Sequence, residues 1–124
     1  MMIVETELKE SSINGLGVFA QTFIPKGSVV WELDDRFYLL VNQKDFESAP
    51  DLMRTNLDIY GYPHMTRSGV LCCEIDNGRF MNHSDDPNTV FTDPNIAFAT
   101  RDIQEGEEIT CNYGHFMPDF KGFD

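Results

Sequence analysis

Residues 77–88 hold the densest run of polar side chains in the chain, among them Asn82, His83, Ser84 and Asp85. Imidazole, hydroxyl and carboxylate groups are the usual acids, bases, nucleophiles and metal ligands of enzymes. However, His83 has no second histidine four residues later, and no Gly-x-Ser-x-Gly motif surrounds Ser84. The same residue types also hydrogen-bond to their own backbone in tight turns. Read alone, the segment is therefore a structural turn.

A second segment that could bind a ligand, residues 14–19, places Gly15 and Gly17 directly before a strand-like stretch. A dinucleotide-binding fingerprint needs a third glycine and a following helix, and this segment has neither. Two glycines before a strand do let the backbone approach a ligand closely. A plain turn explains them equally well.

The third segment, residues 106–114, is a turn followed by a strand that contains Cys111 and leads to Tyr113. Read alone, it indicates a core or edge tyrosine and a small buried thiol. A reactive cysteine needs an electropositive setting, which an acidic chain does not favour.

In their order along the chain, these three segments resemble the signature of the SET-domain protein lysine methyltransferases. The matching residues are Gly15-x-Gly17-Val18-Phe19-Ala20, Arg79-Phe80-x-Asn82-His83-Ser84-x-x-Pro87-Asn88 and Gly106-Glu107-Glu108-Ile109-Thr110-x-x-Tyr113-Gly114. The resemblance runs from about Gly15 to Gly114. It implies a small β fold in which the C-terminal strand passes under a loop of the preceding segment, a pseudoknot. It also implies that S-adenosylmethionine binds on one face and the target lysine enters from the other.

The resemblance implies one catalytic residue, Tyr113, whose hydroxyl would orient the lysine amine and the transferring methyl group. It further implies a set of cofactor-binding residues: Gly15, Leu16, Gly17, Tyr60, Arg79, Asn82, His83 and Phe116. The main chain around Leu16 and Gly17 would contact the methionine part of the cofactor. The main chain of Asn82 and His83 would hold the adenine. Arg79 would brace the loop.

Two of these assignments have alternatives. Tyr60 lies where related sequences place a tyrosine of the cofactor pocket, and Tyr62 is a rival that we otherwise expect in the substrate channel. Phe116 is the nearest of the three tail phenylalanines that could cover the channel or stack on adenine. A terminus packed on itself, or frayed, explains that tail equally well.

The sequence departs from the family pattern at two positions. Many relatives bind zinc through a cysteine at the place of Asp85 and further cysteines in the tail, but residues 115–124 contain none. We therefore expect no metal. Cys111 stands in the substrate channel where relatives often carry Phe or Tyr, and the smaller side chain predicts room for more than one methyl group.

The elements that must position these residues are short strands divided by turn residues. β-branched and aromatic stretches predict strands at residues 3–8, 18–23, 28–33, 37–41, 70–75, 90–92, 96–100 and 108–113. One helix is predicted near residues 50–56, capped by Ser48 or Ala49. A pattern in residues 19–30 recurs in residues 98–109, and each copy reads as a hairpin. The prediction is a compact, mainly β SET fold of several small antiparallel sheets with one or two short helices.

The length and net charge of the chain limit its domain number and its partners. The 124 residues predict one SET domain, with a variable insert at about 34–68 that would govern substrate choice and a short aromatic tail at 115–124. A net charge of −12 disfavours nucleic acid and favours a lysine-rich or arginine-rich protein substrate.

Three cysteines, no signal peptide and no membrane span predict a cytoplasmic protein, or a nuclear or host-nuclear one if the source is eukaryotic or viral. A homodimer, and a catalytically silent SET-like module that binds peptides or partner proteins, are the alternatives left open.

Overall fold

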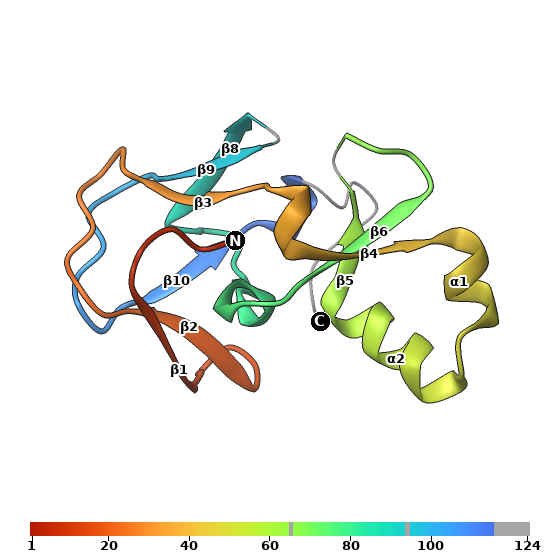
Figure 1. The fold of residues 1–124 in the computed structure, drawn as a ribbon. Helices are drawn as coiled ribbons and strands as arrows, with labels where there is room; N and C mark the ends of the chain where they lie inside the picture. Colours follow the sequence, from red (N-terminus) through yellow and green to blue (C-terminus); the bar gives the residue numbers. More distant parts are fainter. Residues whose placement is uncertain (65, 94, 116–124) are drawn as a thin grey trace.

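A computed structural model describes residues 1–64, 66–93 and 95–115, and it confirms the mainly β prediction (Figure 1). The described strands are β1 (Thr6–Glu10), β2 (Leu16–Ala20), β3 (Val29–Glu32), β4 (Tyr38–Asn42), β5 (Gly61–Pro63), β6 (Val70–Glu74), β7 (Asn82–His83), β8 (Thr89–Asp93), β9 (Ile96–Ala99) and β10 (Glu108–Cys111). The described helices are α1 (Gln43–Ser48) and α2 (Asp51–Tyr60). Single 3-10 turns occupy Asp35–Phe37, Asn77–Phe80 and Tyr113–His115.

The sheet that carries the three signature segments has the strand order β1-β2-β10-β7. β10 pairs antiparallel with β2, with Ile109 opposite Val18, and parallel with β7, with Thr110 opposite Asn82. The last strand thus lies between two strands that precede it in the chain, as expected of the C-terminal pseudoknot. β7 and β10 run in the same direction, so this sheet combines antiparallel and parallel pairing, whereas the sequence predicts antiparallel sheets.

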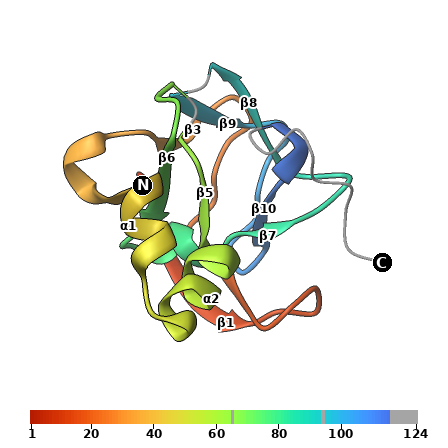
Figure 2. The same ribbon diagram turned by 90° about the vertical axis from the view of Figure 1, so that its right-hand side faces the viewer.

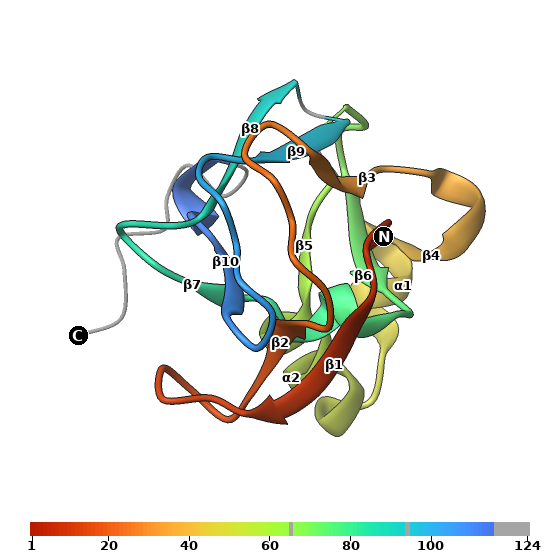
Figure 3. The same ribbon diagram turned by 90° about the vertical axis from the view of Figure 1, so that its left-hand side faces the viewer.

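Two three-stranded antiparallel sheets complete the fold, with the orders β3-β9-β8 and β4-β6-β5. In Figure 3 the first of them lies above β10 and β7, while β1 and β2 lie below. Both helices lie at one end of the molecule, next to the β4-β6-β5 sheet (Figures 1 and 2). Apolar side chains from these sheets meet in one main core, with Val18, Val30 and Ile109 fully buried.

The recurring pattern of residues 19–30 and 98–109 has a structural basis that differs from two separate hairpins. The two copies pair with each other: β2 lies beside β10, and β3 lies beside β9. Ile24 and Ile103 exchange two backbone hydrogen bonds of 2.8 Å. Gly27 and Gly106, at corresponding places, both adopt a left-handed φ, of 87° and 84°. The repeat therefore builds reciprocal pairing across the core.

Side chains of the Pro87–Asn88–Thr89 stretch fasten β10 in its place. The Asn88 side chain is buried; its Oδ1 accepts from the Thr110 backbone N–H at 2.9 Å, and its Nδ2 donates to the Glu108 carbonyl at 2.8 Å. The Thr89 hydroxyl donates to the Thr110 carbonyl at 2.7 Å. These side-chain bonds replace the ladder that a longer strand pair would supply.

The predicted helix exists, but its boundaries were wrong. Ala49 ends α1, a helix that the sequence interpretation missed, and α2 begins only after Pro50 and continues to Tyr60. α1 begins because the Asn42 side chain accepts from the Asp45 N–H at 2.8 Å, an N-cap. Within the described residues, no helix combines the length and apolar character needed to cross a membrane.

Candidate active site

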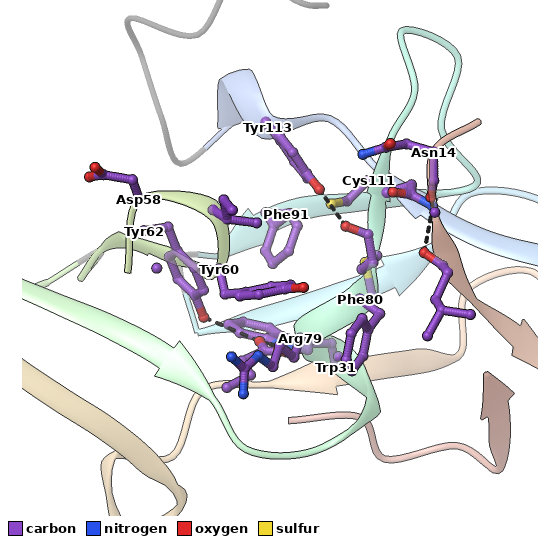
Figure 4. Close-up of a pocket in the computed structure, with 18 residues that line it drawn as sticks. Asn14, Trp31, Asp58, Tyr60, Tyr62, Arg79, Phe80, Phe91, Cys111 and Tyr113 are labelled. Atoms are coloured by element: carbon purple, nitrogen blue, oxygen red, sulfur yellow. Dashed lines mark hydrogen bonds between the residues drawn. The ribbon is translucent and has the colours of Figure 1, made fainter. Parts of the chain in front are cut away.

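A cavity of about 620 Å³ opens where the sheets meet, and residues from all three signature segments line it (Figure 4). Its lining residues are Asn14, Gly15, Leu16, Trp31, Asp58, Ile59, Tyr60, Gly61, Tyr62, Glu74, Gly78, Arg79, Phe80, Met81, Asn82, Phe91, Cys111 and Tyr113. That volume lies in the usual range for small-molecule and cofactor sites.

The cavity collects most of the residues that the sequence singled out. Eight of them line it: Gly15, Leu16, Tyr60, Tyr62, Arg79, Asn82, Cys111 and Tyr113. Gly17 and His83 are not among its lining residues. Phe116 lies outside the described residues. The individual roles of all these residues in binding stay predictions.

Tyr113 is held at both ends by the segment that precedes β8. Its hydroxyl donates to the Met81 carbonyl at 2.5 Å, and its backbone N–H donates to Nδ1 of His83 at 3.0 Å. Because Nδ1 accepts, the other ring nitrogen of His83 carries the proton and donates to Asp85 Oδ1 at 2.7 Å. Figure 4 shows the Tyr113 hydroxyl pointing into the cavity near Cys111. The Asn-His segment therefore fixes the phenol as well as bordering the cavity.

Glu108 connects the glycine segment to Asn82. One carboxylate oxygen of Glu108 accepts from the Ser11 hydroxyl at 2.7 Å, and the other accepts from Asn82 Nδ2 at 2.9 Å. The same Nδ2 lies 3.1 Å from the carbonyls of Asn14 and Leu16. This network positions the Gly15–Leu16 backbone at the rim of the cavity.

The same network explains Gly17. A Cβ at this position would lie 2.8 Å from Cδ of Glu108 and 3.1 Å from Cβ of Ser11. Gly17 therefore leaves room for the close approach of a carboxylate, which is a different reason for a glycine from the backbone–cofactor contact that the sequence predicts.

We expect Gly17→Ala to lower the free energy of unfolding by about 1–3 kcal/mol, because the new methyl group displaces the Glu108 side chain from its two partners. Urea unfolding of a double-mutant cycle with Glu108→Ala measures this. In the Glu108→Ala background the effect of Gly17→Ala should fall to less than half. Additive effects would show that the carboxylate is not the obstacle.

Tyr60 and Arg79 join the end of α2 to the turn before β7. The Arg79 guanidinium lies 4.2 Å from the centre of the Tyr60 ring, a cation–π geometry, and Phe80 contacts the same ring edge-on at 5.7 Å. Gly61 follows directly, and a Cβ at this position would lie 2.5 Å from the Leu57 carbonyl oxygen. The two tyrosines that the sequence treated as rivals thus both line the cavity, with different partners.

The sequence analysis missed three lining residues with strong interactions: Trp31, Glu74 and Phe91. The Trp31 indole N–H donates to Glu74 Oε1, and its ring contacts Phe91 edge-on at 5.1 Å. The Tyr62 hydroxyl donates to the same Oε1 at 3.2 Å, which is the dashed line starting from Tyr62 in Figure 4. Trp31 is the only tryptophan of the chain, and this was the one feature of the sequence that could have pointed to it as a lining residue.

Two side chains of the cavity, Tyr113 and Cys111, stay uncharged more readily than they would in water. Burial raises the pKa of Tyr113, and the thiol of Cys111 and charges of Glu108 and Glu74 raise it further. Burial likewise raises the pKa of the Cys111 thiol, which agrees with a buried, unreactive cysteine. At neutral pH Tyr113 is therefore a neutral hydroxyl. Among the described residues, no three His, Cys, Asp or Glu side chains form a metal-binding group.

The fold and this site define a SET domain. A sequence model of the family, described as "SET domain", matches residues 15–114, which is most of the chain. The protein therefore belongs to the SET-domain family.

Two curated relatives show where such domains occur. The chain is 29% identical over 130 residues to a variant-silencing SET domain-containing protein of Plasmodium falciparum, covering 91% of this chain and 5% of that protein. It is 28% identical over 123 residues to a histone-lysine N-methyltransferase, H3 lysine-36 specific, of Mycosarcoma maydis, covering 89% of this chain and 12% of that protein. The chain thus spans only a small part of either relative.

Solved structures agree with the fold. A Plasmodium falciparum structure described as a candidate histone methyltransferase superposes with a TM-score of 0.63 at 27% identity, covering 90% of this chain and 95% of that one. A humanized mutant of the Chaetomium thermophilum Polycomb Repressive Complex 2 superposes with a TM-score of 0.65 at 24% identity, covering 94% of this chain and 16% of that chain. The second likeness supports the fold alone.

Proposed function

We propose that this chain transfers a methyl group from S-adenosylmethionine to the side-chain amine of a lysine in a basic protein. One observation carries the proposal: the Tyr113 hydroxyl, fixed at the Met81 carbonyl, points into the same cavity that the Gly15–Leu16 segment and Asn82 border. Histone-lysine methyl transfer is the activity named for one curated relative. The family membership supports lysine methyl transfer in general, and the cavity supports this particular form of it.

The lining residues fit the proposed cofactor. At one side, the backbone of Gly15, Leu16 and Asn82 offers polar groups, and Leu16 is about half exposed. Tyr60 and Phe80 offer aromatic surface for a flat ring system. S-adenosylmethionine supplies an activated methyl group on a positively charged sulfur. Gly15, Leu16, Tyr60, Arg79 and Asn82 would hold it.

The remaining lining residues would prepare the lysine. Its amine must be neutral to act as a nucleophile, although the pKa of lysine in water is about 10.4. The aromatic walls formed by Trp31, Phe91 and Tyr62 exclude water and disfavour the ammonium form. The Tyr113 hydroxyl already donates to Met81, so its oxygen can accept an N–H of the amine and align the lone pair.

The net charge of −12 supports a basic substrate, because opposite charge favours encounter and orientation. Exposed acidic residues near the described β4-β6-β5 sheet include Asp51 and Asp58, and Asp58 also lines the cavity. A histone tail, a histone-like protein or a basic ribosomal segment has the required chemistry.

Incubating the protein with methyl-labelled S-adenosylmethionine and a mixture of core histones tests the proposal. We expect label in protein, and we expect the cofactor alone to raise the melting temperature by mass action. A raised melting temperature without any transfer would support the silent peptide-binding module instead. No thermal shift and no transfer would contradict the cofactor assignment itself.

Cys111 provides a prediction about the product. Its side chain is small and fully enclosed at the cavity, so we expect the wild-type protein to form dimethyl-lysine or trimethyl-lysine as well as monomethyl-lysine. Cys111→Phe fills that space and should shift the product to monomethyl-lysine. Mass spectrometry of the modified protein gives the ratio. Monomethyl-lysine alone from the wild-type protein would contradict the steric argument.

A further inference from the structure

One oxygen of the Glu74 side chain holds residues from three other strands. Glu74 is the last residue of β6 and is only 5% exposed. Its Oε1 accepts from the indole N–H of Trp31 on β3 and, at 3.2 Å, from the hydroxyl of Tyr62 on β5. The hydroxyl of Tyr38 on β4 lies 3.4 Å from the same oxygen. Because β3 belongs to a different sheet from β4, β5 and β6, this oxygen connects two sheets.

Two of these donors are walls of the cavity. Trp31 and Tyr62 both line it, and the Trp31 ring contacts Phe91, a third lining residue, edge-on at 5.1 Å (Figure 4). Trp31 and Tyr62 each have one polar side-chain atom, and in both cases that atom bonds to Oε1. Hydrogen bonds of this kind in a buried place make one arrangement of the side chains rigid. Glu74 therefore fixes two walls of the cavity that come from two sheets.

Gly78 explains how the carboxyl is kept in this place. The second oxygen, Oε2, is buried and has no hydrogen-bond partner among the described residues. It packs against Gly78, where a Cβ would collide with it. A buried acceptor without a partner destabilises a protein, so the contacts of Oε1 are what this carboxyl contributes.

We propose that Glu74 is a positioning residue for the reaction in the cavity: through Oε1 it holds the Trp31 and Tyr62 rings in place and so keeps water out. In this role it contacts neither the lysine nor the cofactor. A water-poor environment favours the neutral lysine amine, so loosened walls should slow methyl transfer without weakening cofactor binding. The effect on catalysis rests on the proposed function, whereas the ordering of the two rings rests on the contacts alone.

The indole N–H of Trp31 reports on this ordering directly, because Trp31 is the only tryptophan of the chain and is 2% exposed. Exchange of this hydrogen with deuterated water requires its bond to Glu74 to open. We expect slow exchange in the wild-type protein. Exchange should be about tenfold or more faster in Glu74→Met, which keeps the length of the side chain and removes both acceptor oxygens. Wild-type exchange at the rate of a free indole would overturn the proposal without any variant.

Glu105→Met is the matched control, since Glu105 is exposed and loses the same carboxyl group. Its indole N–H should exchange as slowly as that of the wild-type protein. Equal exchange rates in Glu74→Met and in this control would overturn the proposal.

Gly78→Ala tests the same contact without changing Glu74, and it takes the place of Glu74→Met should that variant fail to fold. The new methyl group meets the far end of a flexible side chain, so the carboxyl moves away from its two donors. We expect faster indole exchange again. A rate unchanged from the wild-type protein would contradict the placement of the carboxyl on which the proposal rests.

The kinetics of methyl transfer test the positioning role. We expect kcat to fall about tenfold or more in Glu74→Met with cofactor affinity little changed, whereas a general loss of structure would lower both. Equal kcat values in Glu74→Met and Glu105→Met would refute the role in catalysis, and so would a loss of cofactor affinity as large as the loss of kcat. No transfer by the wild-type protein, together with an indole exchange that depends on Glu74, would refute the proposed function and leave the ordering role.

Discussion

Tyr113→Phe is expected to reduce methyl transfer about 100-fold or more while the protein stays folded. In the proposed function the phenol oxygen aligns the lysine amine, and misplacing a reacting atom by about 1 Å already has an effect of this size. Among the described residues, removing the hydroxyl deletes its hydrogen bond to the Met81 carbonyl, so the free energy of unfolding should fall by about 1 kcal/mol.

Tritium incorporation into core histones from labelled cofactor, measured at several cofactor concentrations, checks this result. Cofactor affinity should change little, because the proposed function assigns the hydroxyl to the lysine and not to the cofactor. Transfer at the wild-type rate would show that another group aligns the amine. A large drop in melting temperature would show that the loss of activity comes from the fold.

Asn88→Ala is expected to lower the free energy of unfolding by about 3–5 kcal/mol, the largest effect of any polar substitution considered. The side chain accepts from the Thr110 N–H at 2.9 Å and donates to the Glu108 carbonyl at 2.8 Å and to the Glu107 carboxylate at 3.1 Å. Alanine leaves the first two backbone groups without a partner inside the protein. The strand that leads to Tyr113 then loses the Asn88 side-chain bonds that fasten it to the preceding loop, while the bond from the Thr89 hydroxyl to the Thr110 carbonyl remains.

Urea unfolding measures this effect, with Asn56→Ala as the control. The Asn56 side chain is exposed on α2 and bonds only to the carbonyl of Leu52 one turn earlier, so its removal should change stability by less than about 0.5 kcal/mol. Equal small effects for both variants would mean that the buried amide does not hold β10.

The local sequence pattern was sufficient to predict much of the fold. The alternation of β-branched and aromatic residues placed eight strands near their observed positions, since period-two burial is visible in the sequence itself. β5 and β7 were missed because three and two residues carry no period. α1 was missed because its signal is a single capping side chain on Asn42, and its end at Ala49 displaced the predicted start of α2.

The residues of the site also fall into two groups, those within local motifs and those brought together by long-range contacts. Tyr113, Asn82 and the glycine segment lie in motifs, so a resemblance could find them, and the structure brings them to one cavity. Glu74, Trp31 and Phe91 come from three strands far apart in the sequence. β3 and β8 both pair with β9, whereas β6 belongs to another sheet, so the packing of two sheets brings the three residues together. The Gly17–Glu108 contact likewise depends on the register of β2 against β10. Such contacts are long-range, and no local spacing encodes them.

Mass spectrometry of core histones incubated with this protein and deuteriomethyl-labelled S-adenosylmethionine tests the central claim most directly, because it identifies the atom that receives the methyl group. The proposal predicts the label on lysine side chains, with Tyr113→Phe removing it. A cofactor that demonstrably binds while no lysine acquires the label, or a label found on another residue type, would contradict it.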